Sequence, residues 1–289
     1  MTVITTIEDL RQLAKKRVPR MFYDYADSGS WTESTYRANQ SDFQKIKLRQ
    51  RVAVNMENRS TATTLVGSIP AKMPVVIAPV GLTGMQHADG EIKAANAAKK
   101  FGVPFTLSTM SICSIEDVAA GTGNHPFWFQ VYVIRDRGFI ERLIDRAKAA
   151  NCSALVLTLD LQIIGQRHKD LKNGLSAPPK LTLKNIANMM TKPQWGLGML
   201  GTKRRAFGNI VGHVTGVDDM GSLSEWSQKQ FDPTLNWTDV EWIKKRWGGK
   251  LILKGIQDVE DARLGVASGA DALIVSNHGG RQLDGAESS

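Results

Sequence analysis

Residues 272–284 read Ala272-Leu273-Ile274-Val275-Ser276-Asn277-His278-Gly279-Gly280-Arg281-Gln282-Leu283-Asp284, and this stretch decides the fold. An apolar run of strand length is followed by a titratable His and, three residues later, by an Arg that keeps its charge. Two glycines between them allow a sharp turn. A base beside a fixed cation, at the carboxyl end of a parallel strand, suits proton removal from an anionic substrate. The alternative is a loop with a hydrogen-bonded His and a solvated Arg, and the rest of the chain decides between the two.

Upstream of this stretch, apolar runs alternate with helical patterns. Strands are expected at residues 74–79, 104–108, 127–132, 154–160, 251–255 and 272–278, and helices at 90–101, 114–120, 137–150 and 258–268. The expected strands and helices alternate, with starts about 20–30 residues apart, which indicates βαβ units on a parallel sheet. Before them, Thr6 and Asp9 predict a helix that ends at Val18-Pro19, and a second short helix follows at about residues 20–26.

Residues of types common in catalytic and binding sites follow nearly every expected strand. They are Pro79, Val80, Gly81, Ser108, Gln130, Tyr132, Thr158, Asp160, Lys254, His278 and Arg281. Groups from all strand ends converge only if the strands close into a ring, whereas a doubly wound sheet gathers them at one switch point. We therefore predict an α/β fold of the (β/α)8 TIM barrel class. Only about six of eight units are found, so the expected barrel is incomplete.

One domain is expected, built from four successive parts. Residues 1–60 would form an N-terminal helical cap, 70–160 the first four barrel units, 161–250 a basic insertion and 251–289 units five and six. The insertion carries 14 Lys or Arg against 7 Asp or Glu, a net charge of +7, and five of the seven Trp residues. We expect either a solvated insertion with its Trp residues packed on the body, or peripheral contact with an anionic membrane or partner. Nucleic acid is disfavoured, because the basic residues are dispersed.

The sequence predicts neither a membrane span nor a signal peptide, and its cysteines do not form a metal-binding motif. No apolar run approaches the ~18 residues of a membrane span, and residues 1–20 lack a signal-peptide centre. Cys113 and Cys152 are isolated, without zinc-ligand spacing, so no metal is expected and both are interpreted as buried residues in a reducing compartment. These features favour a cytoplasmic protein, with the inner face of the membrane as its peripheral site.

A dinucleotide-like pattern lies inside the insertion. Residues 196–201 match G-x-G-x-x-G, and Asp218 follows at about the required distance of 20 residues. The preceding residues 192–195 are interpreted as a turn, where a buried strand would be needed. We therefore reject a nicotinamide site and interpret the glycines as local flexibility.

The ordered motifs resemble the FMN-dependent L-2-hydroxy acid dehydrogenase and oxidase family, over the whole chain. The matching segments are 23–25 (YDY), 77–79 (IAP), 106–108 (TLS), 129–132 (FQVY), 157–160 (LTLD), 254–255 (KG) and 276–284 (SNHGGRQLD). Residues 165–170 (GQRHKD) and 181–183 (LTL) resemble bacterial L-lactate dehydrogenases most. The resemblance implies FMN-dependent oxidation of a 2-hydroxy acid to a 2-keto acid, with L-lactate the expected substrate.

The resemblance also implies roles for individual residues. His278 would be the base and Asp160 the carboxylate that stabilises its protonated form. Arg281 and Arg167 would bind the substrate carboxylate, although Arg167 lies in a basic loop where a solvated role is the alternative. Tyr25 and Tyr132 would donate hydrogen bonds to the substrate. The FMN-binding residues would be Pro79, Val80, Gly81, Ser108, Gln130, Thr158 and Lys254, the last of these facing the negative charge of the reduced flavin.

The resemblance covers only part of a typical family member. Strands seven and eight, with the loops that grip the FMN phosphate, are missing from the sequence, so we expect a C-terminally truncated chain. One alternative is therefore a non-catalytic fragment that does not retain FMN. Another is an oxidase that uses oxygen in place of a quinone or cytochrome acceptor. The full-length protein is expected to be a homo-oligomer.

Overall fold

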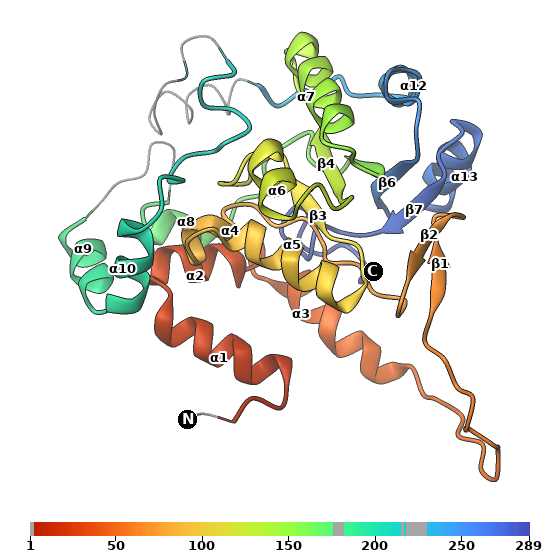
Figure 1. Cartoon of the computed structure of the whole chain (residues 1–289), viewed down its shortest axis with the longest axis horizontal. Coiled ribbons are helices and arrows are strands. Elements are labelled where there is room, and N and C mark those ends of the chain that lie inside the picture. The colour runs from red at the N-terminus through yellow and green to blue at the C-terminus, as the bar shows by residue number, and fades with distance from the viewer. Residues whose placement is uncertain (1–2, 176–181, 215–216, 218–229) are drawn as a thin grey trace.

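The computed structural model describes residues 3–175, 182–214, 217 and 230–289 (Figure 1). At its centre five parallel strands lie side by side in chain order. They are β3 (Thr106–Ser108), β4 (Trp128–Tyr132), β5 (Ala154–Thr158), β6 (Leu251–Ile256) and β7 (Ala272–Val275). α5 (Gly90–Phe101) precedes β3, and the helices between the strands include α6 (Ile115–Gly121), α7 (Arg137–Ala149), α12 (Trp237–Trp247) and α13 (Val259–Ala267). The fold is an α/β TIM barrel that is incomplete, since β3 and β7 are the outer strands of the five-stranded sheet.

Four predicted helices and five of six predicted strands are confirmed, with small shifts at their ends. The strand predicted at residues 74–79 is wrong. Only Ile77 pairs there, through one parallel bridge to Phe105. Pro74 and Pro79 lack the N–H that a longer ladder would use. A hairpin of β1 (Thr63–Leu65) and β2 (Ile69–Ala71) precedes this segment and was not predicted.

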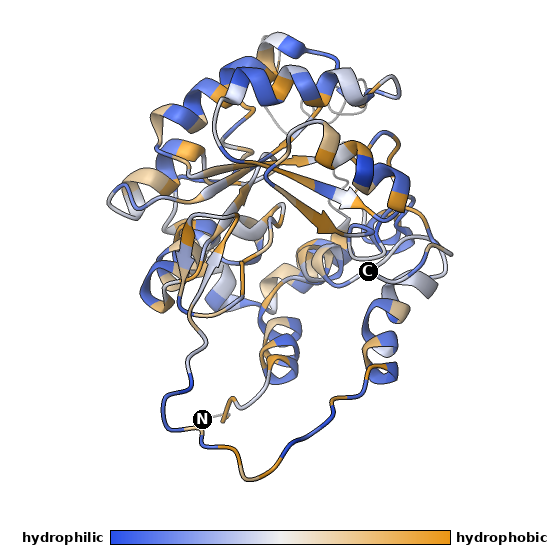
Figure 2. Ribbon diagram, turned by 90° about the vertical axis from the view of Figure 1, so that its right-hand side faces the viewer, coloured by the Kyte–Doolittle hydropathy of each residue, from blue (hydrophilic) through white to orange (hydrophobic). Residues whose placement is uncertain are grey.

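Strands β3 to β6 are largely buried on both faces, as parallel strands usually are, whereas the outer strand β7 is partly exposed. Figure 2 shows them as an apolar centre with amphipathic helices around it. One face packs under the helices, where Leu107, Phe129 and Leu155 are fully buried. The other face, inside the curve of the sheet, carries Trp128, Ala154, Val156 and Ile252. Cys113 and Cys152 are both buried and unpaired, as predicted.

The N-terminal helices lie beneath the sheet in Figure 1. The first is α1 (Ile7–Arg17), which begins with the predicted capping box of Thr6 and Asp9. It is followed by α2 (Arg20–Ala26), at its predicted position, and by α3 (Ser34–Ser41) and the short η1 (Asp42–Lys45). The cap residue of α3 is Glu33, in a left-handed conformation (φ 63) and without a side-chain capping bond. The carboxylate of Asp284 takes over this function by accepting hydrogen bonds from the backbone N–H of Thr35 and the hydroxyl of Ser34.

The segment between β5 and β6 has helices and, in its described residues, no named strand. It contains α8 (His168–Lys172), α9 (Leu183–Met190) and α10 (Pro193–Leu200). The interpretation of residues 192–201 as a turn with flexible glycines is wrong, because Pro193 starts α10 and the glycines lie in it or at its end. Asp218 and Trp226 lie outside the described residues. Trp195 stacks on Phe22 with ring centroids 5.8 Å apart, so this Trp packs on the body of the protein.

Candidate active site

The carboxyl end of β7 brings an imidazole and a carboxylate together. Nδ1 of His278 lies 2.7 Å from Oδ1 of Asp160, which follows β5. A carboxylate can only accept here, so Nδ1 carries the proton and Nε2 is the free basic atom. Gly255 makes this approach possible. It has φ +104, and a Cβ added there would lie 2.7 Å from Cγ of Asp160.

Ser276 links the base to the predicted flavin-facing lysine. Its hydroxyl oxygen accepts from Nζ of Lys254 at 3.0 Å and from the backbone N–H of His278 at 3.1 Å. His278 has φ 61, the left-handed region that is uncommon for a residue with a side chain. Its backbone geometry is therefore held by the residues around it and is not a local preference.

Lys254 is a partly buried cation that forms no ion pair with the described residues. Burial lowers the pKa of its ammonium group, and the nearby charge of Asp160 acts in the opposite direction. A buried ammonium without a carboxylate partner is costly unless an anion meets it. This observation fits a ligand that carries negative charge next to Lys254.

Ser108, Gln130 and Thr158 form one polar row across three neighbouring strands. The hydroxyl of Ser108 donates to Oε1 of Gln130 at 3.1 Å, and Nε2 of Gln130 donates to the hydroxyl of Thr158 at 3.0 Å. Thr158 pairs with Lys254 in the register of β5 and β6, so the row ends beside the buried ammonium. All three side chains are buried.

Two arginines share the ring of Tyr25. The guanidinium carbon of Arg281 lies 4.9 Å from the ring centroid, and that of Arg167 lies 5.4 Å from it. Arg281 also donates to the backbone carbonyls of Tyr25 and Ser28. The N-terminal helices therefore bring Tyr25 to the same place as residues that follow β5 and β7.

Arg167 is largely shielded from solvent, which disfavours the solvated role raised as the alternative for it. Its Nε donates to Oδ2 of Asp170 at 2.6 Å, and both side chains are largely shielded from solvent. Burial raises the pKa of Asp170, although the charges of Arg167 and Arg281 act against it. The ion pair leaves the terminal nitrogens of Arg167 for other partners.

Tyr132 and the segment 79–81 border this group. Burial raises the pKa of the Tyr132 phenol, and the nearby Tyr25 and Asp160 act in the same direction. A Cβ added to Gly81 would lie 2.9 Å from the Tyr25 hydroxyl, so the chain passes close to that hydroxyl. Val80 is 45% exposed, so much of its side chain is accessible to solvent.

Sequence reasoning missed three residues that hold this site together. Ser276 joins Lys254 to the backbone of His278, Asp170 pairs with Arg167, and Gln282 donates to the carbonyls of Asp160 and Ile163. Each belongs to a motif quoted above. Their polar type next to a functional residue was the available signal, but only the folded chain shows their partners.

The residues present fit FMN. Lys254 supplies a partly buried cation without an ion-pair partner among the described residues, and the row of Ser108, Gln130 and Thr158 supplies donors and acceptors beside it. An isoalloxazine ring carries both polar edges and, when reduced, negative charge. The donor set therefore suits this cofactor better than a neutral apolar ligand.

Comparisons with known proteins agree with this geometry. A model of the FMN-dependent dehydrogenase family matches residues 14–289. An L-lactate dehydrogenase of Ectopseudomonas mendocina (strain ymp) is 45% identical over 99% of this chain and 75% of its own length. An L-lactate dehydrogenase of Xanthomonas campestris pv. campestris (strain B100) is 46% identical over 99% of this chain and 74% of its own.

Solved structures give the same result. The crystal structure of the monotopic membrane protein (S)-mandelate dehydrogenase superposes with a TM-score of 0.92 at 34% identity, over 99% of this chain and 75% of that chain. A mandelate oxidase superposes with a TM-score of 0.79 at 31% identity, over 98% of this chain and 72% of that chain.

Proposed function

The chain belongs to the FMN-dependent dehydrogenase family, and from this premise we propose that it oxidises L-lactate to pyruvate. The L-lactate dehydrogenase relatives are 45–46% identical to it, whereas the mandelate dehydrogenase structure is 34% identical. This difference supports a small side group on the substrate over an aromatic one. The single observation that carries the chemistry is the contact of His278 with Asp160.

We propose that Nε2 of His278 removes a proton from the 2-hydroxy acid. Asp160 stabilises the imidazolium that results, as a carboxylate does in hydrolytic triads. FMN, when bound, would take up the two electrons together with the second hydrogen that leaves the substrate. Lys254 would then lie near the negative charge of the reduced flavin, which would favour electron transfer by electrostatics.

The substrate carboxylate is proposed to bind between Arg281 and Arg167. A guanidinium fixes a carboxylate in orientation as well as in affinity, because two parallel hydrogen bonds are available. Tyr25 lies against both guanidinium groups and Tyr132 lies nearby, so their hydroxyls are the proposed donors to the substrate. Pro79, Val80 and Gly81 would contact the flavin through their backbone.

The test is anaerobic reduction of the protein reconstituted with FMN. We expect L-lactate to bleach the flavin absorbance, (S)-mandelate to do so more slowly, and D-lactate to have no effect. The variant His278→Gln should keep the flavin spectrum and lose the bleaching. Faster bleaching by (S)-mandelate would overturn the choice of lactate, and bleaching by no 2-hydroxy acid would overturn the activity.

We also propose that the protein docks on an anionic bilayer and passes electrons to a membrane quinone. Residues at helical spacing on α9 and α10 are exposed and apolar: Leu183 is 86% exposed, Met190 79%, Leu197 71% and Leu200 76%. Within the described residues, every helix is too short or too polar to cross a bilayer. A surface contact is therefore the form of association that this face supports.

Exposed basic residues next to this apolar face support the choice of an anionic bilayer. Figure 1 shows α9 and α10 side by side at one margin of the molecule, next to α1 and α2. Nζ of Lys192 donates to the carbonyl of Lys16 at 2.6 Å, and Asn188 accepts from the backbone N–H of Arg20 at 2.8 Å. These bonds place the exposed cations of α1 and α2 beside the apolar face: Lys15, Lys16, Arg17 and Arg20. A similar structure, (S)-mandelate dehydrogenase, is a monotopic membrane protein by its description.

Sedimentation with vesicles tests this docking. We expect binding to vesicles rich in phosphatidylglycerol at low salt, weaker binding at high salt, and none to phosphatidylcholine alone. Leu197→Glu should weaken binding, while Val266→Glu, an equally exposed apolar residue on α13, should not. Absence of binding at low salt, or equal effects of the two variants, would contradict the proposal. Rapid reoxidation of the flavin by air and not by a quinone would favour an oxidase instead.

A further inference from the structure

The side-chain amides of Asn39 and Asn277 form a hydrogen-bonded pair, called the amide pair, next to the proposed base His278. Nδ2 of Asn39, on α3, donates to Oδ1 of Asn277 at 2.8 Å, and Nδ2 of Asn277 donates back to Oδ1 of Asn39 at 2.7 Å. Asn277 precedes His278 and is only 5% exposed. Two residues that are 238 positions apart are therefore joined by a reciprocal bond next to the candidate active site.

The Asn277 amide uses all its hydrogen-bonding capacity. Besides Asn39, its Oδ1 accepts from the backbone N–H of Gly280 at 2.8 Å and its Nδ2 donates to the carbonyl of Glu287 at 2.8 Å. An Asn side chain offers two donors and two acceptor sites, and all four are occupied. The bonds to Gly280 and Glu287 also fix which way the amide faces, so it cannot rotate to suit a changed partner.

The amide pair braces the turn that presents His278. The turn needs positive φ at His278, Gly279 and Gly280, which costs free energy for a residue with a side chain. The bond from Gly280 to Asn277 closes this turn, and Asn39 holds Asn277 in place from outside. Arg281 is fixed independently, through the carbonyls of Tyr25 and Ser28.

We propose that Asn39 and Asn277 are positioning residues that hold the His278 imidazole in line with Asp160 for proton removal. The proposal rests on the function proposed above. It predicts that disturbing Asn39 affects proton removal and leaves binding of the substrate carboxylate nearly unchanged.

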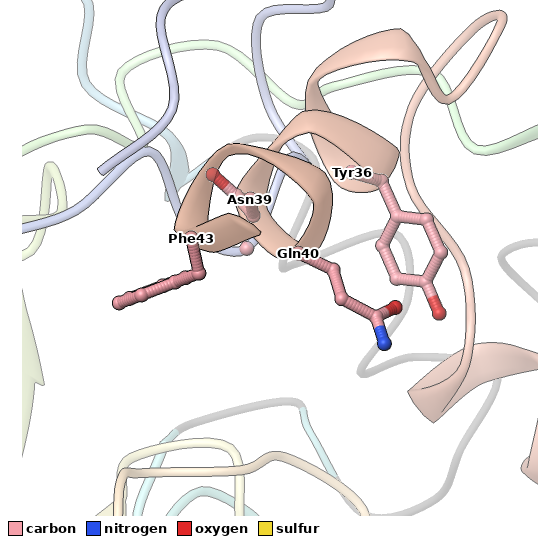
Figure 3. Close-up of a pocket in the computed structure, with 5 residues that line it drawn as sticks. Tyr36, Asn39, Gln40 and Phe43 are labelled. Carbon is pink, nitrogen blue, oxygen red and sulfur yellow. The ribbon is translucent and has the colours of Figure 1, made fainter. Parts of the chain in front are cut away.

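The informative variant is Asn39→Asp, with Gln40→Glu as its control. Figure 3 shows that Asn39 and Gln40 project from α3 in different directions, and Gln40 makes no hydrogen bond with the described residues. Both variants add one negative charge to the same helix. At neutral pH the new carboxylate of Asn39→Asp faces Oδ1 of Asn277 without a proton to donate, so the reciprocal bond is lost.

Steady-state kinetics give the first readout. We expect kcat for L-lactate to fall about 10- to 100-fold in Asn39→Asp, as expected for impaired general-base catalysis, with KM changed less than about twofold. Acidification should reduce the deficit, because a protonated carboxyl group can donate to Asn277 and accept from it as an amide does. The deficit of Asn39→Ala should not depend on pH. The titratable neighbours Asp42 and Glu287 are present in all variants. Dividing the kcat of each Asn39 variant by the kcat of Gln40→Glu therefore removes their effect.

A second readout needs no substrate. The proton on Nδ1 of His278 should give a downfield NMR signal that is absent from His278→Gln. We expect Asn39→Asp and Asn39→Ala to broaden or remove it, and Gln40→Glu to retain it. An unchanged signal in Asn39→Ala, or a parallel change of kcat and KM, would overturn the proposal. If no 2-hydroxy acid reduces the wild-type flavin, the proposed function fails while this signal still tests the amide pair.

Discussion

Nδ1 of His278 and Oδ1 of Asp160 lie 2.7 Å apart, although 118 positions separate the two residues in the chain. The carboxylate holds the imidazole in one tautomer and one orientation, with Nε2 free. Gly255, at the bulge in β6, leaves the space in which the Asp160 side chain lies. The geometry of the base therefore depends on three consecutive strands, β5 to β7.

Replacement of Asp160 by Asn should slow flavin reduction by L-lactate about 100-fold or more, because the amide cannot stabilise the imidazolium by charge. Stopped-flow bleaching measures this rate. Asp261→Asn, an exposed carboxylate on α13, is the control and should have no effect. Equal rates in Asp160→Asn and wild type would remove Asp160 from the mechanism.

Asp170→Asn should act on substrate binding. Without the charge of Asp170, Arg167 keeps at most one neutral hydrogen bond to residue 170, and its orientation is less restricted. We expect this change to weaken the binding free energy of the substrate by about 1–1.5 kcal/mol. KM for L-lactate should rise roughly tenfold, and kcat should change little. A fall in kcat at constant KM would instead place Asp170 in the chemical step.

Lys254→Met should make the flavin harder to reduce. The variant keeps the length of the side chain and removes the buried charge, so negative charge on the reduced cofactor loses its stabilising partner. We expect a lower midpoint potential in a spectroscopic redox titration, and a slower reduction by L-lactate. A potential equal to that of the wild type would show that the ammonium does not face the flavin.

Gly255→Ala should lower both stability and activity. A positive φ of 104 costs roughly 1–3 kcal/mol for a residue with a side chain, and the added Cβ would overlap Asp160. The control is Gly269→Ala, which has φ +78 and no atom within 4 Å of the added Cβ. Urea unfolding should report a loss for both variants, whereas only Gly255→Ala should impair lactate oxidation.

Asp271 provides a test of stability against pH. Burial raises the pKa of this carboxyl, but hydrogen bonds from Lys244, the backbone N–H of Leu251 and Lys250 outweigh it and lower the pKa to about 2. The folded pKa lies below the ordinary aspartate pKa of 3.8, so the stabilisation is complete above about pH 4 and is lost as the pH falls toward 2. Asp271 is exposed, so solvent screening reduces this gain, and we expect Asp271→Asn to lower the free energy of unfolding by roughly 1 kcal/mol at pH 7 and by less at pH 3. A difference that does not depend on pH would contradict this origin.

Much of the fold could be predicted because its strands and helices have strong local signals. Apolar runs such as that of β5, capped helices such as α1 and the glycine after α5 all act within a few residues. Residues 74–79 have the apolar pattern of a strand, but two of them are prolines, which have no backbone N–H to donate. The apolar pattern therefore predicted a strand that does not pair along its length. The glycines of α10 misled the prediction in the opposite direction, because Pro193 and the packing of Trp195 favour a helix that glycine alone disfavours.

The site was predictable in its residue types and less so in its connections. Polar residues at strand ends indicate a shared rim, and the resemblance supplied expected roles. The partners of Arg167 and Lys254 depend on the three-dimensional path of loops, which no spacing encodes. The amide pair shows this most clearly, because Asn39 has no feature in the sequence that relates it to residue 277.

The cap that Asp284 provides for α3 has a consequence for how the chain folds. Because α3 lacks a capping side chain of its own, its first turn depends on a carboxylate that is synthesised about 250 residues later. Contacts of such long sequence separation form late and slowly. The first turn of α3 should therefore stay frayed on the ribosome until Asp284 has emerged, and the proposed base and α3 should become ordered in a single late step.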